Sequence, residues 1–188
     1  LVQLLKFFKD KGYEVHVVTN EDSNIPYCDV KHKVSFERNP IRFNNIKAII
    51  NLKKIIDKEK FDIIHCHTPM GSVVTRLASI KARKNGTRVI YTAHGFHFYK
   101  GASLLNWCIF YPIEKLLSYV TDDLITINSE DYNLAVKKFH TKNVHLVSGV
   151  GVSKEKFDFE LTKEQKLELR SSLGIQENDI VLIYVAEL

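Results

Sequence analysis

Three short apolar runs, separated by segments with helical spacing, limit what this chain can fold into. The runs are residues 61–66, 87–93 and 123–127, and a shorter one at residues 144–147 extends the pattern. Apolar runs of this length are typical of strands buried on both faces in a parallel sheet. A parallel strand needs a crossover, usually a helix, to reach the next strand. The alternation therefore predicts an α/β fold, with a parallel sheet, right-handed crossovers and helices on both faces.

The segments around these strands have the spacing and the end signals of helices. Residues 44–60 place isoleucines on one face and lysines on the other, which predicts an amphipathic helix. Thr68 is suited to cap a helix over residues 69–84 that has proline at its first position. Ser103 can cap a further helix, which Pro112 should kink or divide in two.

The beginning of the chain fits the same sheet, with one element missing. Residues 1–11 have helical spacing, Gly12 is placed to end that helix, and residues 13–19 predict a strand. A weaker strand signal covers residues 28–36. In a doubly wound sheet a strand should precede the first helix, and the sequence starts without Met inside a helical pattern. We therefore expect a fragment that lacks its first strand.

A change in composition predicts a boundary between two domains, over residues 1–152 and 153–188. The second part opens with a charged connector. Thr162 and Gln165 then have the spacing of a capping box at the start of a helix, and residues 179–186 predict a strand. We interpret this part as the first helix and strand of a second domain.

Composition excludes some classes of protein and favours an anionic ligand. No apolar run in the 188 residues approaches the ~20 that a bilayer-spanning helix needs. The three cysteines are odd in number and lack metal-ligand spacing, so we expect no disulfide framework, and a reducing cytoplasm fits. The net charge of +5 and the pI of about 9.0 favour a phosphorylated ligand, an anionic membrane surface or nucleic acid.

Chemically active side chains follow three of the predicted strands at the point where each strand ends. His67 follows the first strand, and His94 and Gly95 follow the second. Asn128 and Ser129 follow the third strand and are suited to cap the helix after it. Open α/β sheets bind ligands beyond the carboxyl ends of their strands. We therefore expect these groups at one rim, together with helix N-termini whose unpaired N–H groups attract anions.

Three kinds of site are possible at this rim. A metal centre is not expected, because strand alternation points His65 and His67 to one side and Cys66 to the other, and no acidic ligand or CxxC pair supports it. A dinucleotide site needs a GxGxxG turn, and Gly149 with Gly151 lacks the third glycine and the helix. The third kind of site would bind a sugar or a phosphate ester. Histidine, asparagine and backbone N–H groups are suited to bind hydroxyls and phosphate.

Four segments, taken in order, resemble the N-terminal half of a glycosyltransferase family 4 enzyme of the GT-B type. They are residues 61–69, 92–97, 127–131 and 147–157. The likeness extends over nearly the whole chain and is closest to bacterial enzymes that build capsule and exopolysaccharide. It implies two Rossmann-like domains that face each other across a cleft. The N-terminal domain would hold most of the acceptor, and the C-terminal domain would hold the nucleotide of the donor.

The resemblance also implies an activity and roles for residues. The reaction would be transfer of a hexose, with retention of configuration, from a nucleotide sugar such as a UDP-sugar to a saccharide or polyprenyl-pyrophosphate-linked acceptor. No metal or other cofactor is implied. His94 would be the catalytic residue that faces the donor sugar and orients its hydroxyls, and not a general base. Asn128 and Ser129 would lie at the cleft wall, with His67 and Gly95 as further substrate contacts.

Further candidates lie near the same loop. We expect Phe96, His97 and Lys100 at the mouth of the acceptor site, and Lys100 with Arg38 is a candidate grip on a pyrophosphate. We expect the aromatic helix over residues 104–120 to belong mostly to the core; the alternative is that its exposed side, beside Lys100 and Lys115, rests on anionic lipid. We expect a cytoplasmic protein, peripheral at most on the inner face of the plasma membrane, with no nucleic-acid partner.

The chain departs from the family pattern in ways that define a second hypothesis. The glycine-rich loop of the family should precede Leu1 and its paired glutamates should follow Leu188, so neither is present. The usual Asn-Gly-Val-Asp turn is replaced by residues 148–153. We therefore expect the chain alone to lack the donor-nucleotide site and transferase activity. The alternative is a non-catalytic module that binds acceptor or membrane and needs a separate donor-binding subunit.

Overall fold

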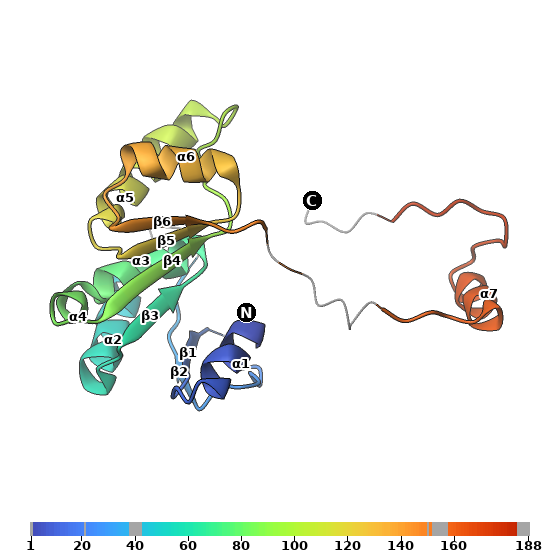
Figure 1. The fold of residues 1–188 in the computed structure, drawn as a ribbon, viewed down its shortest axis with the longest axis horizontal. Helices are drawn as coiled ribbons and strands as arrows, with labels where there is room; N and C mark the ends of the chain where they lie inside the picture. Colours follow the sequence, from blue (N-terminus) through green and yellow to red (C-terminus); the bar gives the residue numbers. More distant parts are fainter. Residues whose placement is uncertain (1, 21, 38–42, 150, 152–157, 184–188) are drawn as a thin grey trace. The chain divides into compact units, whose positions relative to one another are not determined.

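The computed structural model describes residues 2–20, 22–37, 43–149, 151 and 158–183. The chain divides into two compact units, Leu1–Val150 and Gly151–Leu188 (Figure 1). This division lies close to the boundary predicted near residue 152.

In the first unit, short strands alternate with helices in the order that the sequence predicts. The elements are α1 (Val2–Asp10), β1 (His16–Thr19), β2 (Val30–Lys33), α2 (Asn44–Glu59), β3 (Ile63–Cys66), α3 (Pro69–Ala78), α4 (Ile80–Lys84), β4 (Arg88–Ala93), α5 (Leu104–Ser118), β5 (Asp123–Thr126), α6 (Ser129–Lys138) and β6 (Asn143–Leu146). Within the described ranges, no helix has the length and apolar character that crossing a membrane requires.

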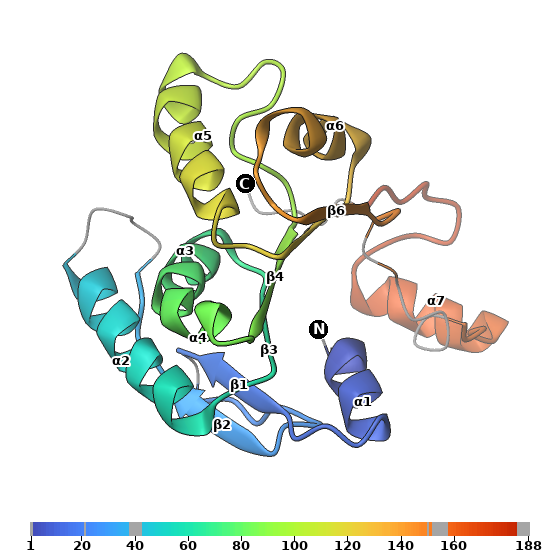
Figure 2. The same cartoon turned by 60° about the vertical axis from the view of Figure 1, so that its left-hand side comes forward.

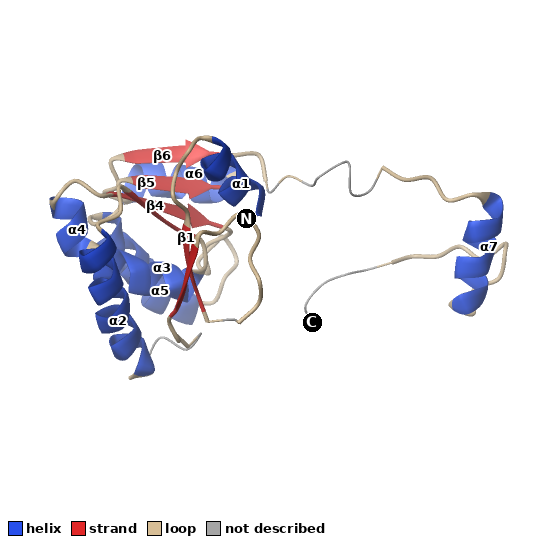
Figure 3. Ribbon diagram, turned by 90° about the horizontal axis from the view of Figure 1, so that it is seen from below, coloured by secondary structure: helices blue, strands red, loops and turns tan. Residues whose placement is uncertain are grey.

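All described strands pair in parallel, as predicted, but they form two sheets. The larger sheet has the order β3-β4-β5-β6, and β1 pairs with β2. Figure 3 shows β4, β5 and β6 side by side in one layer. In this order each helical crossover carries the chain to the neighbouring strand. The strand that we expect ahead of α1 would precede Leu1, so it stays a prediction.

The core of the first unit lies between the larger sheet and its helices. Tyr91, Ala93 and Leu124 are almost wholly buried and cluster with aromatic rings of α5 and with Phe139 at the end of α6. A second cluster joins α2 and α3 to β3. Figure 2 shows α1 on the opposite side of the strands from α2 and α3, so helices flank the strands on both sides.

Of the two caps predicted for α3 and α5, only the one at α5 is present. Ser103 accepts a hydrogen bond from the first turn of α5, as predicted, whereas Thr68 makes no side-chain cap bond at α3. The helix predicted over residues 69–84 is interrupted at Ser79, whose hydroxyl bonds to a carbonyl of the preceding turn, a contact that bends helices. Pro112 lies inside the single helix α5 and does not divide it.

A buried ion pair connects α3 to α5. Arg76 is 1% exposed, and its Nη1 lies 2.9 Å from Glu114 Oε2. Its Nε donates to the Ser72 carbonyl at 3.2 Å and its Nη2 to Ser72 Oγ at 3.0 Å. The guanidinium also lies 4.3 Å from the centre of the Tyr91 ring on β4. The charge is therefore paired and hydrogen-bonded where water is excluded, which is the condition for a buried ion to be tolerated.

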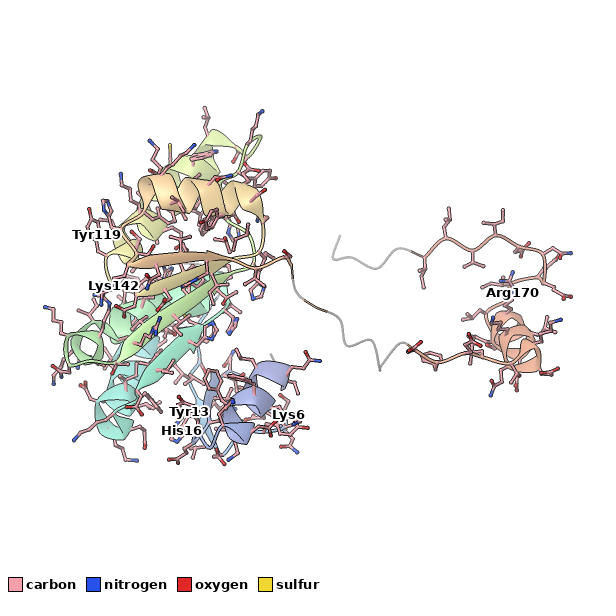
Figure 4. The ribbon with its side chains drawn as sticks, viewed as in Figure 1. Lys6, Tyr13, His16, Tyr119, Lys142 and Arg170 are labelled. Carbon is pink, nitrogen blue, oxygen red and sulfur yellow. The ribbon has the colours of Figure 1, made fainter. Side chains whose placement is uncertain are left out.

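The amino ends of β4, β5 and β6 are held by a second polar network. Arg88 donates to both carboxylate oxygens of Asp123, at 2.6 and 2.8 Å, and Asn143 donates to the same group at 3.1 Å. The hydrogen bond from Arg88 holds the pKa of Asp123 well below its ordinary value. Lys142, labelled in Figure 4, pairs with the adjacent Asp122 at 2.7 Å. This edge of the sheet therefore contributes to stability through ion pairs.

The second unit contains α7 (Lys163–Ser172), which begins with the predicted capping box. Thr162 Oγ1 accepts from the Gln165 amide at 3.3 Å, and Gln165 Oε1 accepts from the Thr162 amide at 3.0 Å. Both partners of the box satisfy a helix N–H group that would otherwise lack a partner.

The strand predicted over residues 179–186 is wrong for the part that the structure describes. Residues 179–183 are not in a strand, and residues 184–186 lie outside the described residues. Ile180 and Leu182 are 93% and 94% exposed. An apolar run becomes a strand only when a neighbouring strand pairs with it, and no described strand pairs with this segment.

Candidate functional site

The carboxyl ends of three adjacent strands meet at one edge of the larger sheet, as the sequence predicts. β4 lies between β3 and β5 and is parallel to both. His67 follows β3, His94 follows β4 directly, and Asn128 caps the helix that follows β5. Parallel pairing therefore brings the three residues to a common edge, which we call the rim.

Three imidazole rings form a row on β3 and β4 at this rim. The ring centres of His65 and His67 are 4.1 Å apart, and those of His67 and His94 are 5.7 Å apart. His65 Nε2 lies 2.8 Å from Thr92 Oγ1, which fixes the inner ring of the row. His94, at the outer end, is exposed. The row therefore runs from the His65 ring, which is bonded to a neighbouring strand, to the His94 ring, which is exposed.

Burial keeps two of these rings uncharged. Burial, with a contribution from the nearby His94, lowers the pKa of His65 to about 4. Burial, with contributions from His65 and His94, lowers the pKa of His67 to about 3. At neutral pH each ring is therefore a neutral imidazole with one N–H donor and one acceptor nitrogen. His67 Nδ1 is buried without a hydrogen-bond partner among the described residues. Such rings suit hydroxyl groups, which also donate and accept.

Acid should destabilise the first unit through these two histidines. Their folded pKa values lie below the value of about 6.5 expected in the unfolded chain, so the unfolded state takes up protons first as the pH falls. The contribution of the two neutral rings to the free energy of unfolding is therefore fully present above about pH 6.5. It is lost progressively as the pH falls toward 4. We expect the Tm to fall over this range, and to fall less steeply in His67→Gln. An unchanged slope in His67→Gln, equal to that of the exposed control His140→Gln, would contradict this account.

The loop after β4 turns at Gly95 and then enters the core. Gly95 has φ of +134°, which side chains rarely adopt, and open space surrounds the position of a Cβ there. Phe96 is only 6% exposed, and its ring stacks on Phe98 with centres 4.9 Å apart. Phe96 was predicted at the mouth of an acceptor site. Its ring is instead part of the core, because the turn at Gly95 directs the following residue inward.

Backbone strain at Gly95 gives a stability prediction. Gly95→Ala should reduce the free energy of unfolding by about 1–3 kcal/mol, because alanine would be held at a positive φ. Gly151→Ala, at a position with ordinary φ and open space, should change it by less than about 0.5 kcal/mol. Urea denaturation of both variants compares the two values. Equal effects would show that the turn does not require glycine.

Carboxylates in the first turn of α6 fix this loop. Asp131, which is 3% exposed, accepts from the Phe96 amide at 3.0 Å and from Asn128 Nδ2 at 2.8 Å. Asn128 Oδ1 in turn accepts from the Asp131 amide at 2.8 Å, so the predicted cap is confirmed. Glu130 accepts from the Lys100 amide at 2.5 Å. Sequence reasoning missed this clamp, because Asp131 and Phe96 are 35 residues apart in the chain.

The other predicted site residues lie around the same loop. His97 is exposed and its ring stacks on Phe110 of α5, with centres 4.7 Å apart. Lys100 and Ser129 are exposed. Arg38 lies outside the described residues, so its pairing with Lys100 stays a prediction.

The described residues contain no group of three or more histidine, cysteine or acidic side chains placed to hold a metal ion. Cys66 lies in the apolar core while His65 and His67 face the other way, as strand alternation predicts. Burial raises the pKa of the Cys66 thiol to about 12, so it stays protonated at neutral pH. The neutral rings of His65 and His67 can both donate to and accept from a polar ligand.

Known proteins resemble this chain over most of its length. A family model described as "Glycosyl transferase 4-like" matches residues 1–129. A Bacillus subtilis (strain 168) protein, EpsD, that is named as a glycosyltransferase is 46% identical over 187 residues, which is 97% of this chain and 48% of that protein. An Escherichia coli protein named UDP-Gal:alpha-D-GlcNAc-diphosphoundecaprenol alpha-1,3-galactosyltransferase is 25% identical over 197 residues, which is 100% of this chain and 49% of that protein.

A third relative, an uncharacterized 41.2 kDa protein in the cps region of Klebsiella pneumoniae, is 30% identical over 132 residues, 68% of this chain and 36% of that protein. The chain spans about half the length of EpsD and of the galactosyltransferase. The family match runs from α1 to the start of α6 and so includes all three strand ends of the rim. The chain belongs to the glycosyl transferase 4-like family.

Proposed function

We propose that the protein containing this chain is a retaining glycosyltransferase of surface polysaccharide synthesis. It moves a hexosyl group from a nucleotide sugar, a UDP-sugar in the first instance, to a lipid-linked saccharide acceptor. In this proposal the chain is the acceptor-side part of the enzyme, and a second domain holds the donor nucleotide. The chain alone is then inactive as a transferase.

The observation that carries the proposal is the row of His65, His67 and His94 at the carboxyl edge of the sheet. Two of its rings are held neutral by burial and the third is exposed. Neutral imidazoles can donate to one sugar hydroxyl and accept from another, whereas imidazolium rings only donate. The row therefore suits a ligand with several hydroxyl groups.

His94 acts in this scheme by orienting the hexose. The bond between the anomeric carbon and the diphosphate oxygen breaks, and a bond to the acceptor hydroxyl oxygen forms. The acceptor proton leaves with the nucleoside diphosphate. His94, fixed beside the rigid end of β4, bonds to hydroxyls of the transferred sugar, while Asp131 holds the loop that follows. Fixing the sugar in a reactive orientation lowers the barrier through positioning and electrostatics.

Relatives support the acceptor class. The Escherichia coli relative is named for transfer from UDP-Gal to an acceptor on diphosphoundecaprenol, and the Klebsiella pneumoniae relative is named for the cps region. We expect the protein that contains this chain, as their relative, to use substrates of the same chemical classes.

Product analysis tests the proposal. The full-length protein is incubated with a panel of nucleotide sugars and polyprenyl-pyrophosphate-linked saccharides, and the products are identified by mass spectrometry and by NMR of the new linkage. The proposal expects one hexose to be added, with the anomeric configuration of the donor preserved. Inversion of configuration would refute retention. The absence of transfer from every donor, by protein that is folded, would refute the transferase assignment.

A further inference from the structure

Thr92 places a buried hydroxyl group two residues before His94 on β4. The residue is only 8% exposed. Side chains two positions apart on a strand point to the same face, so Thr92 and His94 share one face of β4 and His65 and His67 share one face of β3. Two pairs therefore lie across these neighbouring strands. The inner pair is His65 and Thr92, and the outer pair is His67 and His94.

The inner pair is joined by a hydrogen bond. His65 Nε2 lies 2.8 Å from Thr92 Oγ1. A threonine hydroxyl both donates and accepts, so it can bond to this nitrogen whether or not the nitrogen carries the proton. A half-turn of the ring would put the carbon Cε1 against the hydroxyl in place of Nε2, and the bond would be lost. The bond therefore fixes the orientation of the His65 ring.

The rings of the outer pair are held by packing. Nδ1 of His67 is buried without a hydrogen-bond partner among the described residues, and His94 is exposed. The His67 ring lies against the His65 ring, with centres 4.1 Å apart, and the His94 ring lies 5.7 Å from that of His67. The orientation of the outer rings therefore depends on the ring of His65, which Thr92 fixes.

We propose that Thr92 is a positioning residue for the transferase reaction. Its hydroxyl fixes the His65 ring, and that ring holds His67 and His94 in the orientation that meets the transferred sugar. The inference rests on the proposed function, because it needs His94 to contact the hexose. Thr92 acts through the rings and not on the substrate. A small misplacement of a group that orients a substrate lowers the rate of the chemical step.

A matched pair of variants separates positioning from a role in stability alone. Thr92→Val keeps the shape of the side chain and removes its hydroxyl. Thr87→Val does the same at the opposite end of the strand, just before β4 begins. There the Thr87 hydroxyl donates to the Phe61 carbonyl at 2.7 Å, so a bond of similar length is lost far from the rim. Both variants lose one hydrogen bond, and only Thr92→Val loses the bond to His65.

Initial rates of the full-length protein test the inference. Thr92→Val should lower kcat about five-fold or more and change KM by less than about two-fold, whereas Thr92→Ser, which keeps the hydroxyl, should restore kcat. Thr87→Val should leave both constants unchanged. In Thr92→Val/His65→Phe the two losses in kcat should not add, because both substitutions break the same contact. A kcat for Thr92→Val equal to that for Thr87→Val, or losses that add, would overturn the inference.

Nuclear magnetic resonance of the ring nitrogens tests the positioning without catalysis. In full-length protein labelled with ¹⁵N at histidine, the two nitrogens of His65 should give separate N–H and bare-nitrogen signals at neutral pH. In Thr92→Val these signals should move toward each other as the tautomers exchange, and those of His67 should shift. Thr87→Val should give the wild-type spectrum. Unchanged signals in Thr92→Val would overturn the inference. Shifted signals in a protein without transferase activity would refute the proposed function and leave the hold of Thr92 on the rings intact.

Discussion

Replacing Arg76 with alanine is expected to reduce the free energy of unfolding by about 3–5 kcal/mol, the largest effect of any substitution considered for this fold. The carboxylate of Glu114, whose side chain is only 10% exposed, would then stay largely buried without its partner. The same substitution removes the bonds to Ser72 and the contact with the Tyr91 ring. Urea denaturation of the purified variant measures the change.

Two controls make this result specific to a buried charge. The double variant Arg76→Met/Glu114→Leu removes both ions and should recover most of the lost stability, because two apolar side chains of similar size can replace a buried pair at little cost. Lys53→Ala breaks an exposed pair with Asp57 on α2 and should cost less than about 0.5 kcal/mol. A cost below about 1 kcal/mol for Arg76→Ala would mean that Glu114 reaches water, contrary to the structure.

Under the proposed function, His94→Ala should reduce the turnover of the full-length protein by about 100-fold or more, while the protein stays folded. The side chain is exposed at the end of β4, so its loss leaves no cavity in the core. A contact that orients the sugar at the reacting centre counts mainly in the transition state, so kcat should fall more than KM rises. Initial rates over a range of donor concentrations separate the two constants.

The matched control for this variant is His140→Ala. His140 is also exposed, and its ring stacks on Tyr119, with centres 4.1 Å apart. Turnover by His140→Ala should equal that of the wild type. His94→Asn, which keeps a hydrogen-bond donor and acceptor, should recover part of the activity. Near-normal turnover by His94→Ala would remove His94 from the mechanism.

The sequence predicted those parts of the fold that depend on local chemistry. Asn128, Ser103 and Thr162 cap helices as expected, because a cap depends on one side chain and the next turn. The strand ends of the rim were predicted because alternating strands and helices leave few possible orders of strands. The parallel pairing then follows from the need for crossovers.

Contacts between distant residues could not be predicted in the same way. The apolar pattern of residues 179–186 predicts a strand, but a strand also needs a partner, and the pattern contains no information about one. The pair Arg76–Glu114 and the bond from Phe96 to Asp131 join residues 38 and 35 positions apart. Phe96 was expected at a site because it follows His94, whereas the backbone turn at Gly95 places its ring in the core.

A crystal structure of the full-length protein with a nucleotide sugar bound would show whether the rim holds the transferred sugar. We expect the sugar hydroxyls to lie within hydrogen-bond distance of the His94 ring, at the rim formed by the ends of β3, β4 and β5. A hexose bound at another edge of the sheet, with His67 and His94 apart from it, would rule out the rim as the sugar site.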